Sequence, residues 1–197
     1  ETVSELWLNF IQYHTSRDFF LEVVELFGRD LLRVRKDLKL LRRPATKVRT
    51  GVRNMEKKDT QIALECQIAI NSPVKAKASS VRKAHYDNVL EVYAGLLYLR
   101  HPEDTSTGGA LEVFKCKGRC KEATPAQMKK FGLRKEEKEF FAPTSLVRTN
   151  HVPYAANTFV MFVNSAHSIH GVTPRTKTPF SRRIINFTAQ IPGRSRG

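Results

Sequence analysis

The sequence of 197 residues has little of what marks several large protein classes. It contains no run of about 18 apolar residues, so we expect no helix that spans a membrane. Only three cysteines occur, and this small, odd number argues against the disulfide framework of a secreted protein. The first residues include neither a basic segment nor a small-residue cleavage site, which predicts a cytoplasmic protein.

Several common catalytic and nucleotide-binding motifs are also missing. The sequence has no GxGxxG, no GxxxxGKS/T and no GxSxG, so dinucleotide binding, P-loop phosphate binding and serine-hydrolase chemistry lack their key residues. A structural zinc site is not favoured, because Cys116 and Cys120 supply only half of a four-ligand set. We therefore expect three ordinary thiols.

Positive charge is what the sequence has in excess. Lys and Arg number 34 against 19 Asp and Glu, which gives a formal net charge of +15 and a pI near 10.0. Such a charge is typical of proteins with an anionic partner, such as a nucleic acid, an acidic surface or an anionic small molecule, although solubility alone also explains it. The surplus lies mainly in residues 33–58 and 115–150.

Hydrophobic periodicity predicts that the chain begins with helices. Between residues 4 and 40, apolar residues recur at i, i+3 and i+4, which is typical of two successive helices, the first capped by Ser4. The basic stretch 33–58 is interrupted by Pro44 and Gly51, so we expect a helix end followed by a loop.

From residue 60 the hydrophobic period changes to two, which predicts strands. Helices first and strands later indicate an α+β fold with a mainly antiparallel sheet or barrel. Long insertions between strands are usually functional, and the basic stretch 115–150 is expected to be one. The expected strands are 62–70, 92–99, 110–114, 157–163 and 183–189.

The length suits one hydrophobic core, so we expect residues 1–197 to form a single domain. Within it, residues 1–58 are expected to be helical support. Residues 60–191 are expected to form the strand-rich core, with the insertion 115–150 inside it.

A small set of histidines and one aspartate offers metal chemistry. His85 and Asp87 are two residues apart, so on an extended segment both side chains point the same way and reach one ion. Such a pair alone indicates little, but His167 and His170 each offer a second imidazole further along the chain. Two histidines and one carboxylate form the facial triad that binds non-haem Fe(II) and leaves positions open for a 2-oxo acid and O2.

An arginine at the start of the last strand fits the same chemistry, because a guanidinium forms a fixed fork for a carboxylate. Arg182 and Arg183 are both candidates. Alternation places Arg182 on a face with polar residues and Arg183 on a more apolar face, which favours Arg182 for a site interior. The two faces are Arg182, Ile184, Asn186 and Thr188, and Arg183, Ile185, Phe187 and Ala189.

These residues, in this order, resemble the Fe(II)- and 2-oxoglutarate-dependent oxygenase superfamily over roughly residues 62–191. His85-x-Asp87-Asn88 looks like the proximal metal motif of its prolyl-hydroxylase-like and phytanoyl-hydroxylase-like branches. Residues 96–99, followed by the Gly-Gly turn in 108–112, resemble the next strand, loop and turn of prolyl hydroxylases. 

The resemblance continues in the C-terminal part of the chain. His170-Gly171-Val172 looks like the distal metal histidine with its turn, which favours His170 over His167. Arg182, which follows a serine, is similar to the arginine that binds the co-substrate. 

The resemblance implies a double-stranded β-helix, which is a jelly-roll or cupin-type barrel, buttressed by the N-terminal helices. It implies that His85, Asp87 and His170 bind Fe(II). It also implies that Arg182 and the Tyr98 hydroxyl bind 2-oxoglutarate.

The implied activity is that of an oxidoreductase, a dioxygenase that uses O2 and 2-oxoglutarate and releases succinate and CO2 while hydroxylating a substrate. Stimulation by ascorbate is a further expectation. The positive charge motivates an anionic small molecule or carbohydrate as the substrate.

Three alternatives stay open: a prolyl-type hydroxylase acting on protein, a nucleic-acid-directed oxygenase, and a non-catalytic cupin-like binding barrel. The nucleic-acid alternative is not favoured, because no basic groove interleaved with aromatic residues is recognisable. The sequence does not predict the oligomeric state.

Overall fold

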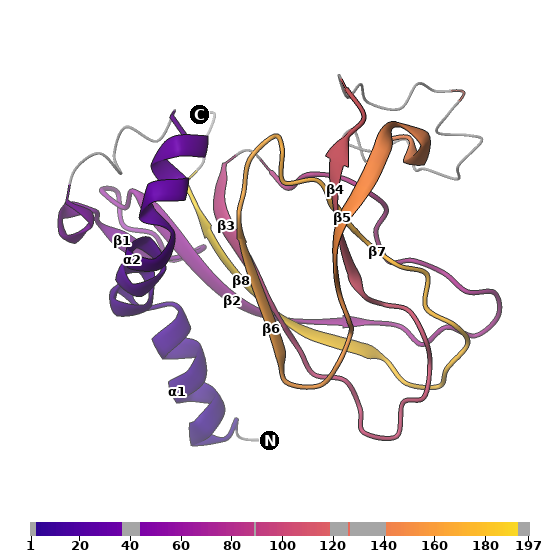
Figure 1. The fold of residues 1–197 in the computed structure, drawn as a ribbon. Coiled ribbons are helices and arrows are strands. Elements are labelled where there is room, and N and C mark those ends of the chain that lie inside the picture. Colours follow the sequence, from indigo (N-terminus) through magenta and orange to yellow (C-terminus); the bar gives the residue numbers. More distant parts are fainter. Residues whose placement is uncertain (1–2, 37–43, 89, 119–125, 127–140, 193–197) are drawn as a thin grey trace.

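The computed structural model describes residues 3–36, 44–88, 90–118, 126 and 141–192, and Figure 1 shows two layers of strands with helices beside one of them. Within these ranges, no helix combines the length and the apolar composition that crossing a membrane requires. The helices are α1 (Glu5–His14), α2 (Arg17–Val34) and the short 3-10 helices η2 (Ala45–Lys47) and η3 (Pro143–Ser145). The strands are β1 (Thr50–Val52), β2 (Ile62–Asn71), β3 (Glu91–Tyr98), β4 (Leu111–Cys116), β5 (Leu146–Val152), β6 (Thr158–Val163), β7 (His170–Val172) and β8 (Arg182–Gln190).

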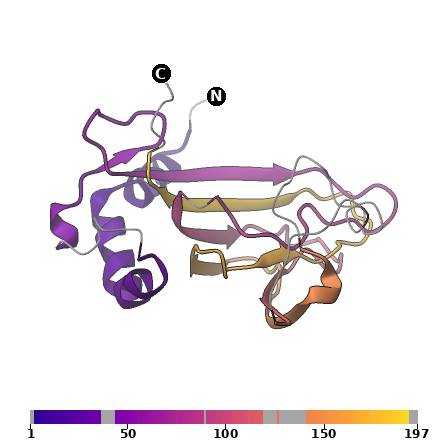
Figure 2. The same ribbon diagram turned by 90° about the horizontal axis from the view of Figure 1, so that it is seen from above.

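Two sheets carry these strands. The larger sheet has the order β1-β2-β8-β3-β6, and the smaller sheet has the order β5-β4-β7. Neighbouring strands are antiparallel except β1 and β2, which are parallel. Figure 2 shows β2 and β8, the longest paired strands, lying side by side. The expected mixed composition, with helices first and mostly antiparallel strands later, is confirmed, whereas the closed barrel stays a prediction.

The two helices begin at serine residues, but only one serine acts as a cap through its side chain. Ser16 precedes α2, and its Oγ accepts a hydrogen bond from the Phe19 backbone N–H at 3.2 Å. Ser4 precedes α1 as predicted, but its side chain accepts no capping hydrogen bond. The cap fixes where α2 starts and therefore which of its faces meets the sheet.

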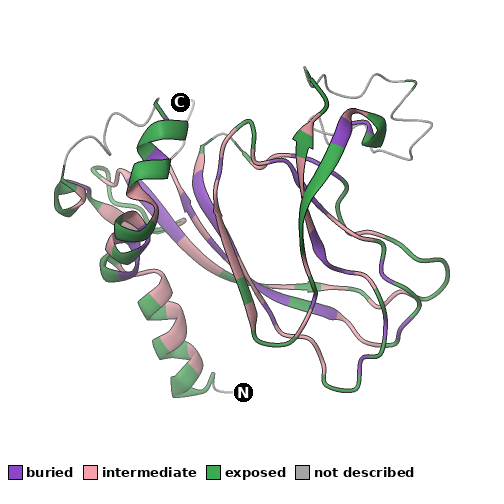
Figure 3. Ribbon diagram, in the orientation of Figure 1, coloured by how far each residue is buried: buried purple, intermediate pink, exposed green. Residues whose placement is uncertain are grey.

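α2 packs its apolar stripe against one face of the larger sheet, and the residues between them are among the most buried in the chain (Figure 3). Burial of large apolar side chains stabilises such a contact by roughly 1.5–3 kcal/mol each. The helices therefore cover this face and leave the opposite face of the sheet for a cavity. The buried cluster consists of Phe19, Phe20, Val23, Leu31, Val48, Ile62, Leu64, Val92, Tyr93 and Ala189.

β8 shows the two faces that alternation predicts. Phe187 lies on the helix side, where its ring centroid is 4.7 Å from that of His14 and 6.1 Å from that of Phe19. The other face of β8 borders a cavity on the inner side of the sheet. The residues of β8 that line this cavity are Arg182, Ile184, Asn186 and Thr188.

The five predicted strands correspond to β2, β3, β4, β6 and β8, with ends that differ by at most two residues. Three further strands, β1, β5 and β7, were not predicted. β5 lies inside the expected insertion 115–150, where it pairs antiparallel with β4, and β4 itself extends to Cys116. The insertion is therefore shorter than predicted, and residues 119–125 and 127–140 of it lie outside the described residues.

The expectation of three ordinary thiols is wrong. Cys116 is disulfide-bonded, whereas Cys66 is a free cysteine. Burial, followed by the charge of Glu65, raises the pKa of the Cys66 thiol to about 11, so this thiol is protonated at neutral pH. Cys120 lies outside the described residues.

A Gly-Gly turn before β4 needs glycine for a steric reason. Gly108 and Gly109 have φ angles of 82° and 76°, a region that other residues rarely adopt. A Cβ on Gly108 would lie 1.9 Å from the backbone oxygen of Pro174. The turn brings the Gly109 carbonyl to Arg182, whose Nε donates to it at 3.2 Å.

Candidate metal centre

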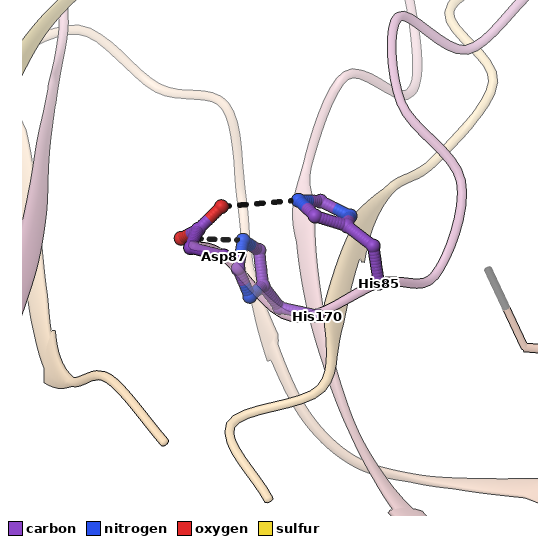
Figure 4. A group of neighbouring side chains, drawn as sticks. All are labelled: His85, Asp87 and His170. Carbon is purple, nitrogen blue, oxygen red and sulfur yellow. Dashed lines mark ion pairs between the residues drawn. The ribbon is translucent and has the colours of Figure 1, made fainter. Parts of the chain in front are cut away.

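His85, Asp87 and His170 meet at one point although 85 residues separate the two histidines in the sequence (Figure 4). The backbones of His85 and His170 form an antiparallel bridge in which each N–H donates to the carbonyl of the other at 2.8 Å. The Asp87 carboxylate faces both rings, 3.3 Å from Nε2 of His85 and 3.5 Å from Nε2 of His170. One ligand atom from each residue lies within 4.8 Å of the others.

Backbone carbonyls fix which ring nitrogen of each histidine faces the centre. Nδ1 of His85 is 2.7 Å from the Lys83 carbonyl oxygen, and Nδ1 of His170 is 2.9 Å from the Ser168 carbonyl oxygen. Because a carbonyl only accepts, each Nδ1 carries the proton, and each Nε2 presents a lone pair. This arrangement is typical of metal-binding histidines.

The spacing of the three ligand atoms suits a divalent metal ion. Two ligands at right angles on a metal with bonds of about 2.1 Å lie roughly 3 Å apart. The distances of 3.3 and 3.5 Å from Asp87 to the two histidines are close to this value. Two imidazoles and one carboxylate on one side of an ion leave its opposite side open for other ligands.

The protonation states also suit metal binding. Burial lowers the pKa of His170 to about 4, so its imidazole is neutral at neutral pH. Burial alone would raise the pKa of Asp87, but its interactions with His85, His170 and Arg82 outweigh this effect and hold the pKa below its ordinary value. Neutral imidazole and ionised carboxylate are the forms that ligate metals.

The three ligands line a cavity of about 360 Å³, whose other walls are the inner faces of β2, β8 and β3. Phe162 packs on the His170 ring, with centroids 4.7 Å apart. Apolar residues cover the middle of the cavity, and charged residues stand at its two ends. The apolar lining residues are Ala69, Val81, Ala94, Leu96, Leu111, Phe162, Val172 and Ile184.

Arg182 occupies one end of this cavity and is 3% exposed. Its guanidinium carbon lies 5.2 Å from the ring centroid of Tyr98 and 5.1 Å from that of Tyr154. Besides the bond to Gly109, Nη1 donates to Asn71 Oδ1 at 3.5 Å, and Nη2 is buried without a hydrogen-bond partner. Among the described residues, no carboxylate pairs with Arg182, and a buried cation without one is costly, so this end fits an anionic ligand.

The structure separates the residues between which the sequence left a choice. His167 is exposed and lies outside the cluster, whereas His170 is buried within it. Arg183 lies on the outer face of β8, where its backbone N–H donates to the Tyr154 hydroxyl at 3.0 Å. Tyr98 is fully buried beside Arg182, and burial raises the pKa of its hydroxyl.

Four charged residues that line the cavity away from Arg182 were missed by sequence reasoning: Arg53, Glu65, Arg82 and Glu91. A signal was present for Glu65, because the polar residues of β2 alternate with its apolar ones and so mark the inner face of the sheet. No comparable signal marks Arg53 or Glu91, since their neighbourhood is defined by pairing between distant strands.

Comparison of the sequence with models of known protein families gives no match, and neither does a search of curated proteins. The chemistry and geometry of the cavity are therefore the basis for assigning a function.

Proposed function

We propose that this chain is an Fe(II)-dependent oxygenase that uses 2-oxoglutarate as its co-substrate. The observation that supports the proposal is that one cavity combines three metal-ligand side chains with a buried arginine that has no carboxylate partner. A 2-oxo dicarboxylate needs both features, because its oxo-acid end chelates a metal and its far carboxylate needs a cation.

We also propose that the two sheets are the halves of a double-stranded β-helix. A jelly roll consists of eight strands in two sheets. The described residues place eight strands in two sheets, and the bridge between His85 and His170 adds a fourth segment beside β7. The remaining bridges, Val74 to Thr178 and Ser79 to Arg175, connect further turns of the chain on that side.

Each residue then has a defined task. His85, Asp87 and His170 would hold the iron, which when bound supplies O2 activation for decarboxylation of 2-oxoglutarate to succinate and CO2 and for hydroxylation of the substrate. Arg182 would bind the far carboxylate through charge-assisted hydrogen bonds, with the Tyr98 hydroxyl beside it. The apolar middle of the cavity excludes water between these two positions.

The test is an anaerobic titration of the purified protein with Fe(II) and 2-oxoglutarate. Chelation of Fe(II) by the 2-oxo acid is expected to give a weak visible absorption band, and admission of O2 is expected to give succinate. His85→Ala and Asp87→Ala should abolish the band, whereas His167→Ala should retain it because His167 is exposed outside the cluster. Absence of both the band and succinate in the wild-type protein would refute the proposal.

A metal-binding barrel without catalysis has a different signature. Such a protein would bind Fe(II) through the same three residues but form no succinate with any substrate pool. The two measurements therefore separate the proposed oxygenase from the non-catalytic alternative.

A further inference from the structure

The charged side chains that line the cavity form pairs, with two exceptions. Arg53 Nη1 lies 2.5 Å from Glu65 Oε2, and Arg82 Nη1 lies 3.4 Å from Asp87 Oδ1. Arg182 has no carboxylate partner, and Glu91 has no cationic partner, within the part of the chain that the structure describes. The cavity therefore has one unpaired positive group and one unpaired negative group.

These two groups lie at opposite ends. Glu91 opposes Gln190 in the pairing of β3 with β8, and Gln190 is eight residues beyond Arg182 along β8. At about 3.3 Å per residue, the two positions are roughly 26 Å apart along the strand. A five-carbon dicarboxylate held at Arg182 does not extend that far, so the Glu91 end is left for a second molecule.

The part of the wall that β2 and β8 contribute toward Glu91 is polar. Gln67 opposes Asn186, and Glu65 opposes Thr188, in the pairing of β2 with β8 on the inner face. The side-chain amides of Gln67 and Asn186 make no hydrogen bond to any described residue, so their donors and acceptors are available to a ligand. This part of the cavity therefore suits a polar molecule.

A bound metal ion adds positive charge at Asp87 but leaves the pairing of the charged side chains in place. A carboxylate that coordinates a metal through one oxygen keeps its other oxygen for a hydrogen bond. Arg82 therefore stays engaged with Asp87, and Arg53 stays engaged with Glu65. Glu91 remains the carboxylate without a partner.

We propose that Glu91 is the specificity-determining residue at the substrate end and that the substrate carries a positively charged nitrogen, such as an ammonium group, that binds its carboxylate. The proposal rests on the proposed function, because it assigns the Arg182 end to 2-oxoglutarate. It differs from the anionic substrate that the net charge of +15 motivates. The described lining of the cavity holds three guanidinium groups and three carboxyl groups, so the positive excess lies elsewhere in the chain.

The surroundings of Glu91 make a cationic ligand favourable. Burial, and then the charge of Asp87, raise the pKa of Glu91 to about 7. The charges of Arg53 and Arg82 offset this rise only in part, and the charge of Glu65 adds to it. The ionised carboxylate is therefore short of stabilising charge, which a ligand cation would supply.

Three probes of equal chain length test the proposal: n-butylammonium, n-butanol and butyrate. Their binding to the full chain loaded with Zn(II) and 2-oxoglutarate is measured by ligand-observed NMR at about pH 8, so that no turnover is required. n-Butylammonium is expected to bind more tightly than the other two. Glu91→Gln should weaken its binding about tenfold, and Glu91→Ala should do the same. Glu103→Gln, an exposed carboxylate outside the cavity, is the matched control and should change nothing.

Each outcome decides the proposal. Failure of n-butylammonium to bind at up to about 50 mM, tighter binding of butyrate, or unchanged binding in both Glu91 variants would overturn it. The same measurement without metal or 2-oxoglutarate separates it from the proposed function. Cation binding at Glu91 without any Fe(II) and 2-oxoglutarate band would retain the cation site and reject the oxygenase. A band without cation binding would retain the oxygenase and reject the cation site.

Discussion

The two ends of the cavity are built in opposite ways. At one end, Arg182 is buried between two tyrosine rings and donates to a backbone carbonyl. Behind it, Arg175 and Asp104 form a buried ion pair at 2.6 Å, with both side chains at most 4% exposed. Away from Arg182, the pairs Arg53–Glu65 and Arg82–Asp87 each include an arginine side chain that is at least 37% exposed.

This difference separates two kinds of recognition. A rigid, buried cation binds one ligand with fixed geometry, because its surroundings cannot rearrange around another shape. Partly exposed ion pairs contribute less to stability and exchange partners more easily. The Arg182 end is therefore suited to a constant co-substrate, and the Glu91 end to selection of the substrate.

The largest effect is expected from removing the charge at the rigid end. Arg182→Met should weaken 2-oxoglutarate binding by about 3 kcal/mol, or more than 100-fold, because a buried carboxylate loses its cation. Titration of the Fe(II) and 2-oxoglutarate band measures the loss, and Fe(II) binding alone should be unchanged. Arg182→Lys should recover only part of the affinity, since lysine keeps the charge and loses the fork. Equal binding in the Arg182→Met variant would place the co-substrate elsewhere.

A smaller effect is expected from the turn that supports Arg182. Gly108→Ala combines a positive φ with a collision against Pro174, so we expect it to lower the free energy of unfolding by about 2 kcal/mol or more. Gly118 also has a positive φ, of 74°, but a Cβ there meets nothing within 4 Å. Gly118→Ala should therefore cost only about 1 kcal/mol in urea unfolding, which is the strain of the backbone alone. Equal losses of unfolding free energy in the two variants would show that the structure relaxes around the contact between the new Cβ and Pro174.

Tyr154 is expected to act as a positioning residue for Arg182. Its ring also lies 5.5 Å from the Arg175 guanidinium carbon, and its hydroxyl accepts the Arg183 N–H at the start of β8. Tyr154→Leu should raise the KM for 2-oxoglutarate about tenfold with little change in kcat, because the cation loses one aromatic wall. Tyr154→Phe keeps the ring and should recover most of this loss. A fall in kcat at constant KM would contradict the positioning role.

The smallest effect is expected from pH at the open end. With its pKa raised to about 7, Glu91 is largely protonated below that value and ionised above it. Binding of n-butylammonium to the metal-free protein should therefore strengthen about tenfold between about pH 6 and pH 8, since the probe itself stays charged throughout. The charged groups that act on Glu91 are Asp87, Arg53, Arg82 and Glu65, and Arg35 donates to its backbone carbonyl. Glu91→Gln should give a flat profile, and a pH dependence that persists in this variant would assign the titration to another group.

Local pattern predicted most of the framework. The change of hydrophobic period located α2 and five of the strands, because each buries one face in a hydrophobic core cluster. Alternation in β8 also separated Arg182 from Arg183, since a strand turns successive side chains to opposite sides. These features depend only on neighbours in the sequence, so the sequence contains them.

The features that sequence reasoning missed depend on distant parts of the chain. β1 and β7 are only three residues long and β5 is mostly polar, and each is held by pairing with a neighbouring strand rather than by its own apolar pattern. No sequence pattern marks Glu91 as a site residue. Only the pairing of β3 with β8 brings its carboxylate to the end of the cavity. The disulfide of Cys116 was missed because three cysteines define no pairing by themselves.

The bridge between His85 and His170 has a consequence for how the protein acquires its metal. Reciprocal main-chain hydrogen bonds fix the distance between the two histidines without any help from an ion. In a zinc finger, by contrast, the metal must fold the polypeptide and the free energy of binding is spent on that ordering. Here the polypeptide is already ordered, so loading and loss of the metal are expected to be reversible chemical steps on a folded protein, and far-ultraviolet circular dichroism should be the same before and after treatment with a chelator.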